Sequence, residues 1–379
     1  MKLSVVILHY NAEAFLHLNL LSVQRAVKNI PSEIIVADNA SDGFDTAFWK
    51  RKYPGVKFLR FDKNYGFAKG NNSAVARAKG EYVVLLNPDT VVPEKIFENL
   101  LQETARLKNP GICGVRLIDG RGMFLAESKR RLPNLLNSFT RIFRLHNLMR
   151  IPYALSYYNS RLEEHDYGPN EVFVGAFMFF ERAKYLETGG FDERYFMYGE
   201  DIDLSRGFSE KGYPGYYFGQ YSVIHFKGES TPKSAAFREH FIRASELYFK
   251  KYHPLTAPLV NPLIRAGLKI KFRLEKTARS GQTGPPENAA VYYLGNDGYV
   301  REKLEKHYGK EIKSATNIFE AEPYSVWVVD PRSITFEDLI RQMIENRHKF
   351  YFYRFLVPDE GLLIGSDHPQ SKGEIIRLR

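Results

Sequence analysis

Cysteine is almost absent from the sequence, which has a single one, Cys113, in 379 residues. One thiol excludes an internal disulfide and any zinc site built from several cysteines. Long apolar runs are also missing, because no stretch reaches the roughly 18 residues that a membrane span needs. The first apolar run follows one lysine and is too short for the core of a signal peptide. We therefore expect a cytoplasmic chain that folds in a reducing compartment.

Signatures of nucleic-acid binding are lacking too, although the formal net charge is +10. The sequence shows no helix-turn-helix, zinc-finger or RNA-recognition pattern. Basic proteins also meet anionic lipid and phosphorylated small molecules. We therefore expect no nucleic-acid partner and favour a phosphorylated ligand.

The first hundred residues alternate between strand and helix patterns. Strands are expected at 3–8, 33–37, 56–61 and 82–86, and helices at 12–28, 44–53 and 67–79. This alternation predicts an α/β fold with a mostly parallel, doubly wound sheet flanked by helices.

The length predicts two or three domains. We divide the chain into a first domain at 1–230, a helical basic segment at 231–283 and a small α/β module at 284–379. The segment 128–158 has no clear period, and we interpret it as a loop over the site. In the last module, strands are expected at 291–294, 325–329 and 350–355, and helices at 300–307 and 336–346. A docking role for a partner enzyme would suit this module.

Polar residues follow several of the predicted strands. In doubly wound sheets, ligands bind beyond the carboxyl ends of the strands. Asn11, Asp38 and Asp89 each lie just past such an end. The Asp38 carboxylate could accept a hydrogen bond from a nucleobase, or it could form a plain turn that caps the next helix.

A glycine-bearing helix start comes next, at residues 64–72. Gly66 and Gly70 allow close backbone approach, Asn64 adds an amide, and Lys69 adds positive charge near the helix N-terminus. That combination suits a diphosphate.

Asn87-Pro88-Asp89 ends a strand of buried type. One carboxylate can be enough for Mg²⁺, which takes its other ligands from phosphate and water. The alternative is a simple Pro-Asp turn. His225 follows a short predicted strand at 221–224, and a lone histidine in such a place is either structural or a ligand.

Three acids, Glu200, Asp201 and Asp203, lie within four residues, after an aromatic cluster and at the start of a helix predicted over 202–211. The helix dipole stabilises negative charge there. A carboxylate beside aromatic rings could act as a general base in a sugar pocket, and the alternative is a set of helix-capping acids.

In this order, the segments resemble glycosyltransferases of family 2, which have the glycosyltransferase-A fold, and most of all the bacterial rhamnosyltransferase-like branch. The resemblance covers residues 1–230. Its motifs are Ser4-Val5-Val6-Ile7 with Asn11, Asp38-Asn39-Ala40-Ser41-Asp42, Asn64-Tyr65-Gly66-Phe67-Ala68 with Gly70-Asn71-Asn72, Leu86-Asn87-Pro88-Asp89, Gly189-Gly190-Phe191-Asp192-Glu193 and Gly199-Glu200-Asp201-Ile202-Asp203-Leu204.

The resemblance implies roles for these residues. Asp38 would contact the nucleobase. Asp89 stands at the last position of the family's metal-binding Asp-x-Asp pattern, whose first position is Asn87 here. Asp201 matches the general base, beside Glu200. His225 matches a histidine that helps to hold the metal or the diphosphate.

The implied activity is inverting sugar transfer that depends on Mn²⁺ or Mg²⁺. The donor would be a dTDP- or UDP-sugar, with rhamnose as the first candidate. The acceptor would be a glycan or lipid-linked glycan at the cytoplasmic membrane face.

Two alternative functions stay open. A sugar nucleotidyltransferase would need a Gly-rich, Arg-containing loop at 9–13, which holds His-Tyr-Asn-Ala-Glu instead. An inactive glycan-binding scaffold would not need Asp89 and Asp201.

The region 250–279 has eight Lys and Arg against one acid, Glu275. Leu263, Ala266, Ile270 and Leu274 share one face of a predicted helix, next to the basic Arg265, Lys269, Arg273 and Lys276, and Phe272 breaks the pattern. This arrangement is typical of a helix at an anionic membrane surface. The alternative is a helix packed on the first domain with a solvated basic face.

Overall fold

The computed structural model describes residues 1–134, 137, 156–227, 235–277, 284–318, 321–368 and 373–378. Within these residues the large sheet has nine strands in the order β3-β2-β1-β4-β8-β6-β9-β5, with β7 paired to β9. The strands are β1 (Leu3–His9), β2 (Ser32–Asp38), β3 (Val56–Arg60), β4 (Tyr82–Leu86), β5 (Thr90–Val91), β6 (Cys113–Ile118), β7 (Tyr167–Pro169), β8 (Phe177–Glu181) and β9 (Tyr216–His225).

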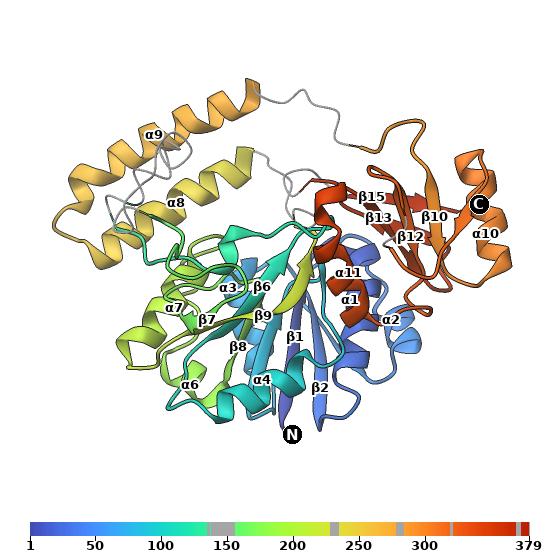
Figure 1. The fold of residues 1–379 in the computed structure, drawn as a ribbon. Coiled ribbons are helices and arrows are strands. Elements are labelled where there is room, and N and C mark those ends of the chain that lie inside the picture. Colours follow the sequence, from blue (N-terminus) through green and yellow to red (C-terminus); the bar gives the residue numbers. More distant parts are fainter. Residues whose placement is uncertain are drawn as a thin grey trace.

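Helices cover both faces of this sheet (Figure 1). They are α1 (Glu13–Ala26), α2 (Thr46–Lys52), α3 (Gly66–Val75), α4 (Ile96–Ala105), α6 (Arg182–Glu187) and α7 (Glu200–Glu210). The central strands β1 and β4 are apolar and buried along nearly their whole length, as expected when helices cover both faces of a sheet. The predicted fold class is therefore confirmed. The helix predicted at 202–211 begins two residues earlier, at Glu200.

The chain order of the strands creates a topological switch point at one edge of the sheet. β1 pairs in parallel with β2 on one side and with β4 on the other. The carboxyl ends of β1 and β4 therefore flank a topological switch point, where doubly wound sheets bind their ligands. β5 then turns back and pairs antiparallel with β9, so that Thr90 lies opposite His225. This turn brings the end of β9 to the loop after β4.

The predicted loop at 128–158 lies mostly outside the described residues. Its two described ends are tied to the first domain, because Arg130 forms isolated bridges with both Tyr158 and Val172.

The C-terminal residues form a second sheet with the order β11-β10-β12-β13-β14-β15. Its strands are β10 (Val291–Leu294), β11 (Lys313–Ser314), β12 (Val326–Val329), β13 (Phe352–Val357), β14 (Leu362–Gly365) and β15 (Glu374–Arg377), with helices α10 (Gly298–Tyr308) and α11 (Phe336–Glu345). Apolar residues of this module pack against the first domain in one shared cluster that includes Phe15, Phe226, Trp327 and Phe355. The Glu94 carboxylate also accepts 2.9 Å hydrogen bonds from the backbone N–H groups of Phe336 and Glu337, which begin α11. The module is thus fixed to the first domain by apolar and polar contacts.

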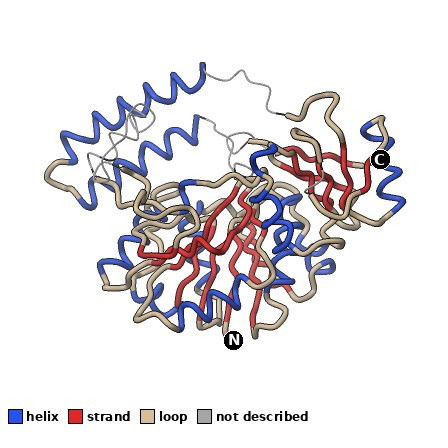
Figure 2. Tube along the Cα trace, in the orientation of Figure 1, coloured by secondary structure: helices blue, strands red, loops and turns tan. Residues whose placement is uncertain are grey.

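Helices α8 (Ala235–Tyr252) and α9 (Ala257–Thr277) form a hairpin. In Figure 1 the hairpin lies at the end of the molecule opposite the N-terminus, with α9 outermost. Because β1 starts at the N-terminus, this is the end to which the parallel strands point their carboxyl ends (Figure 2). On α8, His240 stacks on Phe196, with ring centroids 4.8 Å apart. The hairpin therefore borders the same edge of the sheet as the switch point.

Candidate active site

Asn87, Asp89 and His225 converge at the carboxyl ends of β4 and β9. His225 Nε2 lies 3.5 Å from Asp89 Oδ1 and 3.4 Å from Asn87 Nδ2. The backbone holds this geometry, because the N–H of Phe226 donates to the carbonyl of Asp89 over 3.0 Å. Asp89 is 3% exposed and His225 is 5% exposed.

The chemistry of this group fits a divalent cation. Asp89 Oδ1 and His225 Nδ1 are buried without a hydrogen-bond partner, although buried polar atoms are normally paired. Carboxylate oxygen and imidazole nitrogen are common ligands of transition-metal ions such as Mn²⁺. Two such ligands with phosphate oxygens and water could complete a coordination sphere.

Asp38 lies at the end of β2 and is fully buried. The backbone N–H of Ala12 donates to His9 Nε2 over 3.1 Å, so the His9 proton sits on Nδ1, which faces Asp38 Oδ1 at 3.1 Å. Burial alone would raise the pKa of Asp38, but the hydrogen bonds from His9 and Ser41 hold that pKa below its ordinary value. Asp38 is therefore a carboxylate that organises the loop after β2.

Asn11 joins the ends of β1 and β2. Its backbone N–H donates to Ser41 Oγ over 2.9 Å, and its Oδ1 accepts from the N–H of Asp42, also over 2.9 Å. Asn11 has a φ of 49°, and asparagine tolerates this left-handed region better than most residues. The structure thus brings Asn11 and the loop after Asp38 together at the switch point.

Asn64 and Gly66 are fixed by the neighbouring Asn39. Asn39 Nδ2 donates to Asn64 Oδ1 over 2.8 Å and to the carbonyl of Gly66 over 3.2 Å. Gly66 has a φ of 78°, and an added Cβ would lie 2.3 Å from the carbonyl oxygen of Phe196. The N–H of Phe67 donates to that same carbonyl over 2.7 Å. The start of α3 is therefore locked against the segment that leads to Glu200.

Lys69 lies in the first half of α3 at the surface. Its Nζ is 3.8 Å from Glu193 Oε2 and 5.0 Å from the centre of the Tyr65 ring. In the described structure its charge is thus matched by an acid of the loop before α7.

Glu200 and Asp201 occupy the first turn of α7. The two residues before them, Tyr198 and Gly199, have φ values of 72° and 82°, so the chain turns sharply as it enters the helix. For tyrosine this region is strained, and such strain is often found at functional sites. The helix N-terminus stabilises negative charge at this point.

The Asp201 carboxylate is paired with Arg130. Arg130 Nη2 donates to Asp201 Oδ2 over 2.6 Å and to the carbonyl of Phe173 over 2.8 Å. Burial works against the charged guanidinium, but the Asp201 charge and a hydrogen bond to it raise the pKa of Arg130. A carboxylate has about four lone-pair positions, so these contacts leave room for an acceptor hydroxyl.

Glu200 behaves differently from its neighbour. Burial and the adjacent Asp201 charge raise the pKa of Glu200 well above its ordinary value. Its Oε2 is buried without a hydrogen-bond partner. Glu200 therefore binds its proton more tightly than an ordinary glutamate, whereas Asp201 has an arginine partner, which separates the roles of the two carboxyl groups.

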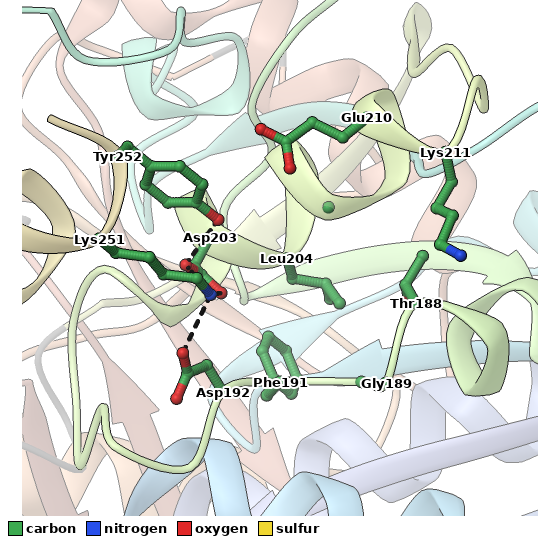
Figure 3. A pocket seen from close by; sticks show the side chains of 12 residues that line it. Thr188, Gly189, Phe191, Asp192, Asp203, Leu204, Glu210, Lys211, Lys251 and Tyr252 are labelled. Carbon is green, nitrogen blue, oxygen red and sulfur yellow. Dashed lines mark hydrogen bonds and ion pairs between the residues drawn. The ribbon is translucent and has the colours of Figure 1, made fainter. Parts of the chain in front are cut away.

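Asp203 does not join the other acids. It accepts hydrogen bonds from Lys251 Nζ at 2.8 Å and from the Tyr252 hydroxyl at 2.9 Å, both at the end of α8 (Figure 3). These residues border a cavity of about 350 Å³ between α7 and the loop 188–192. Of the three candidate acids, Asp203 lines this cavity and Glu200 and Asp201 do not, so Asp203 serves to anchor α8.

The residues 173–176 connect the two halves of the site. The N–H of Asn87 donates to the carbonyl of Ala176 over 3.1 Å. The Phe173 carbonyl accepts from Arg130, and the N–H of Phe173 donates to Ser205 Oγ on α7 over 3.2 Å. Asn87 and the Arg130–Asp201 pair are therefore held by one four-residue segment at the same edge of the sheet.

The structure adds residues that sequence reasoning missed. Arg130 had no signal, because its partner Asp201 is 71 positions away. His9 gave a weak signal as the last residue of the first strand. Lys227 lies two residues after His225 and forms an ion pair with the half-buried Glu127, which places another cation near the end of β9.

Comparison with known proteins shows the family of the chain. Residues 4–188 match glycosyl transferase family 2. A relative from Mycobacterium tuberculosis, "N-acetylglucosaminyl-diphospho-decaprenol L-rhamnosyltransferase", is 30% identical over 246 residues, which span 62% of this chain and 79% of the relative. The chain therefore belongs to glycosyltransferase family 2 and is a glycosyltransferase, as predicted.

Two further proteins are similar. The rhamnosyltransferase WbbL of Escherichia coli is 29% identical over 223 residues, which span 55% of this chain and 78% of that protein. The solved structure of the mannosyltransferase PcManGT from Pyrobaculum calidifontis in complex with GDP-Man and Mn²⁺ is 17% identical, with a TM-score of 0.44, and the match covers 74% of this chain and 76% of that one.

Proposed function

We propose that this glycosyltransferase transfers a sugar, with rhamnose as the first candidate, from a nucleoside-diphosphate donor to a hydroxyl of a lipid-linked or surface glycan, with inversion at the anomeric carbon. The observation that carries the proposal is the presence of the Arg130-held Asp201 carboxyl group and the buried Asp89–His225 group along one edge of the sheet. The names of two relatives, both rhamnosyltransferases, support the choice of sugar.

Asp89 and His225 would hold a divalent cation, Mn²⁺ or Mg²⁺, together with the donor diphosphate, and Asn87 lies beside them. The ion would supply positive charge that neutralises the leaving nucleoside diphosphate. Lys227, two residues after His225, adds positive charge near the end of β9. The buried Asp89 Oδ1, which has no hydrogen-bond partner and faces His225 Nε2, supports this role.

Asp201 would accept the proton of the acceptor hydroxyl as it attacks the anomeric carbon. Arg130 is a positioning residue, because its hydrogen bond fixes the direction of the Asp201 carboxylate. Glu200, whose pKa is raised, would donate a hydrogen bond to the acceptor or to Asp201 when it carries its proton. This division matches the pKa direction of Glu200.

The nucleoside would lie along the loops after β2 and β3. The Asp38 loop, which Asn11 and Ser41 brace, would border the base, with a dTDP- or UDP-linked donor as the expected partner. Asn64 and Gly66 would form the opposite wall, where Asn39 joins the two loops. Lys69 would bind the diphosphate after its contact with Glu193 opens in the complex.

A lipid-linked acceptor is presented at a membrane surface. The enzyme would work at the cytoplasmic face of that membrane. The name of the mycobacterial relative contains such an acceptor, a sugar diphosphate on a polyprenol. Among the residues that the structure describes, every helix is too short or too polar to cross a membrane.

A transfer assay tests this proposal. The protein is incubated with Mn²⁺, a polyprenyl-diphosphate N-acetylglucosamine acceptor, and either dTDP-rhamnose or a UDP-sugar, and the anomeric configuration of the product is read by NMR. We expect an inverted product from at least one donor. Formation of a nucleotide sugar from a sugar phosphate and a nucleoside triphosphate would instead identify a nucleotidyltransferase. Donor binding with neither hydrolysis nor transfer across a screen of donors would favour an inactive scaffold.

A further inference from the structure

Helix α9 carries a row of exposed apolar side chains on its outer face. Leu255, Leu259, Leu263 and Ile270 are 93%, 77%, 72% and 56% exposed. Ala266 is also exposed. With Leu255 in the turn before the helix, these five residues recur every three or four positions, so they form one continuous stripe. We call this row the apolar stripe.

The stripe is not left over from poor packing of the hairpin, because the opposite face of α9 is well buried. Ile264 and Leu268 are 8% and 1% exposed and pack in a cluster with Ile242 and Phe249 of α8. Arg265 also pairs with Glu246 of α8 through two 2.7 Å hydrogen bonds. The inner face therefore already has its partner, and the outer face is a second apolar surface.

The charges beside the stripe identify its partner. Residues 250–274 contain six Lys and Arg and no Asp or Glu. Of these, Lys269 and Arg273 are exposed on the same side of α9 as the stripe. Two copies of α9 that met through the stripe would bring these cations together with no acid to offset them. An anionic bilayer offers both apolar and negatively charged groups.

We propose that the apolar stripe of α9 inserts into the surface of an anionic membrane, with Lys269 and Arg273 on the lipid headgroups. Helices with one apolar face and flanking cations lie in this way at the boundary of headgroups and acyl chains. The alternative of a helix with only a solvated basic face does not fit, because the outward face is apolar.

The position of α9 connects this surface to catalysis. The outermost helix lies over the edge of the sheet at which Asp89 and Asp201 are found, and α8 separates it from that edge (Figure 1). A membrane-bound α9 would turn this edge toward the lipid. Membrane binding is inferred from the apolar stripe and the cations beside it. The delivery of an acceptor from the membrane rests on the proposed function.

Vesicle co-sedimentation of the full chain tests the inference. The vesicles contain phosphatidylcholine with about one third phosphatidylglycerol, or phosphatidylcholine alone. We expect binding to the anionic vesicles at low salt, and binding at least about tenfold weaker for the double variant Leu259→Glu/Leu263→Glu. Lys269→Glu/Arg273→Glu should lose the preference for anionic vesicles.

Leu186→Glu is the matched control, because Leu186 is a 49% exposed leucine on α6, away from the stripe. This variant should bind vesicles like the unaltered chain. Failure of the unaltered chain to bind anionic vesicles, or equal binding by the stripe variant, would overturn the inference. So would a dimer in sedimentation velocity without lipid that Leu259→Glu/Leu263→Glu dissolves, because it would assign the stripe to a second copy. Donor hydrolysis, measured without vesicles, should be unchanged in all these variants. Absence of hydrolysis in the unaltered chain would therefore count against the proposed function and not against membrane binding.

Discussion

Arg130 Nη2 lies 2.6 Å from Asp201 Oδ2, and both side chains are buried. The pair joins the part of the chain that bridges to Tyr158 and Val172 to the first turn of α7. A buried charge without its partner is costly. The Arg130–Asp201 contact therefore affects both the stability of the fold and the ionisation of the proposed base.

Replacing Arg130 tests this double role. In Arg130→Gln, Asp201 stays buried beside Glu200 without its cation, so we expect a loss of about 3–5 kcal/mol in the free energy of unfolding. Because a neighbouring cation favours a charged carboxylate, its loss should move the acidic limb of the pH–rate profile to higher pH. Urea unfolding and transfer rates from acid to neutral pH measure the two effects.

Arg106→Gln is the control for Arg130, because Arg106 forms a surface ion pair with Glu103 and is 72% exposed. It should change stability by less than about 1 kcal/mol. If Arg130→Gln lowers stability but leaves the pH profile in place, Arg130 is structural only.

The raised pKa of Glu200 predicts how stability depends on pH. The folded protein holds the Glu200 proton more tightly than the unfolded chain does. The stabilising contribution of this proton is therefore complete below the ordinary glutamate pKa of about 4.3 and is lost as pH rises through the folded value. Glu200→Gln keeps a neutral side chain at every pH, so its stability relative to the unaltered chain should increase with pH. A relative stability that stays flat or falls from acid to pH 8, measured by urea unfolding, would contradict the protonated state.

Gly66 should not tolerate a side chain. Gly66→Ala places a Cβ 2.3 Å from the Phe196 carbonyl oxygen, and that backbone cannot move without shifting the approach to Glu200. We expect a stability loss above the roughly 1–2 kcal/mol of left-handed strain alone, together with weaker donor binding. Gly43→Ala is the matched control, because Gly43 has a φ of 69° and nothing within 4 Å of an added Cβ. Equal effects of the two substitutions on donor binding would show that the Phe196 contact is unimportant.

Asp89→Ala tests the metal site. The variant should weaken binding of UDP or dTDP when Mn²⁺ is present and leave metal-free binding almost unchanged, because the carboxylate acts through the cation. Calorimetric titration with and without Mn²⁺ measures both. A loss of the same size in both conditions would remove Asp89 from the metal site.

Much of the fold could be predicted from the sequence, because the early strands and helices have clear periods and end at polar turns. Asp89 and Asp201 could be found because they follow a buried strand and begin a helix. β14 and β15 were not predicted, and β15 is largely exposed, so it has no buried apolar face that a sequence period could reveal. Tertiary packing also decides which face of α9 is buried, although the apolar face predicted from Leu263, Ala266 and Ile270 is the one that the structure leaves exposed.

The remaining parts of the site depend on contacts between distant residues. The Arg130–Asp201 pair spans 71 positions and has no local signature. The sequence suggested that Lys69 faces a diphosphate, but its observed neighbour Glu193 comes from a loop more than a hundred residues later. A helix start shows that an anion is favoured there and does not show which neighbouring group meets the lysine.

The most direct test of the account is the Asp201→Asn variant, with donor binding and transfer measured on the same preparation. Asparagine keeps the size of the side chain and can still accept from Arg130, but it cannot take up the acceptor proton. We predict that donor affinity stays within a few-fold while transfer falls by about 10²–10⁴, and that Glu200→Gln has a smaller effect. Near-normal transfer by Asp201→Asn, or a loss of transfer that follows entirely from lost donor binding, would contradict the assignment of Asp201 as the base.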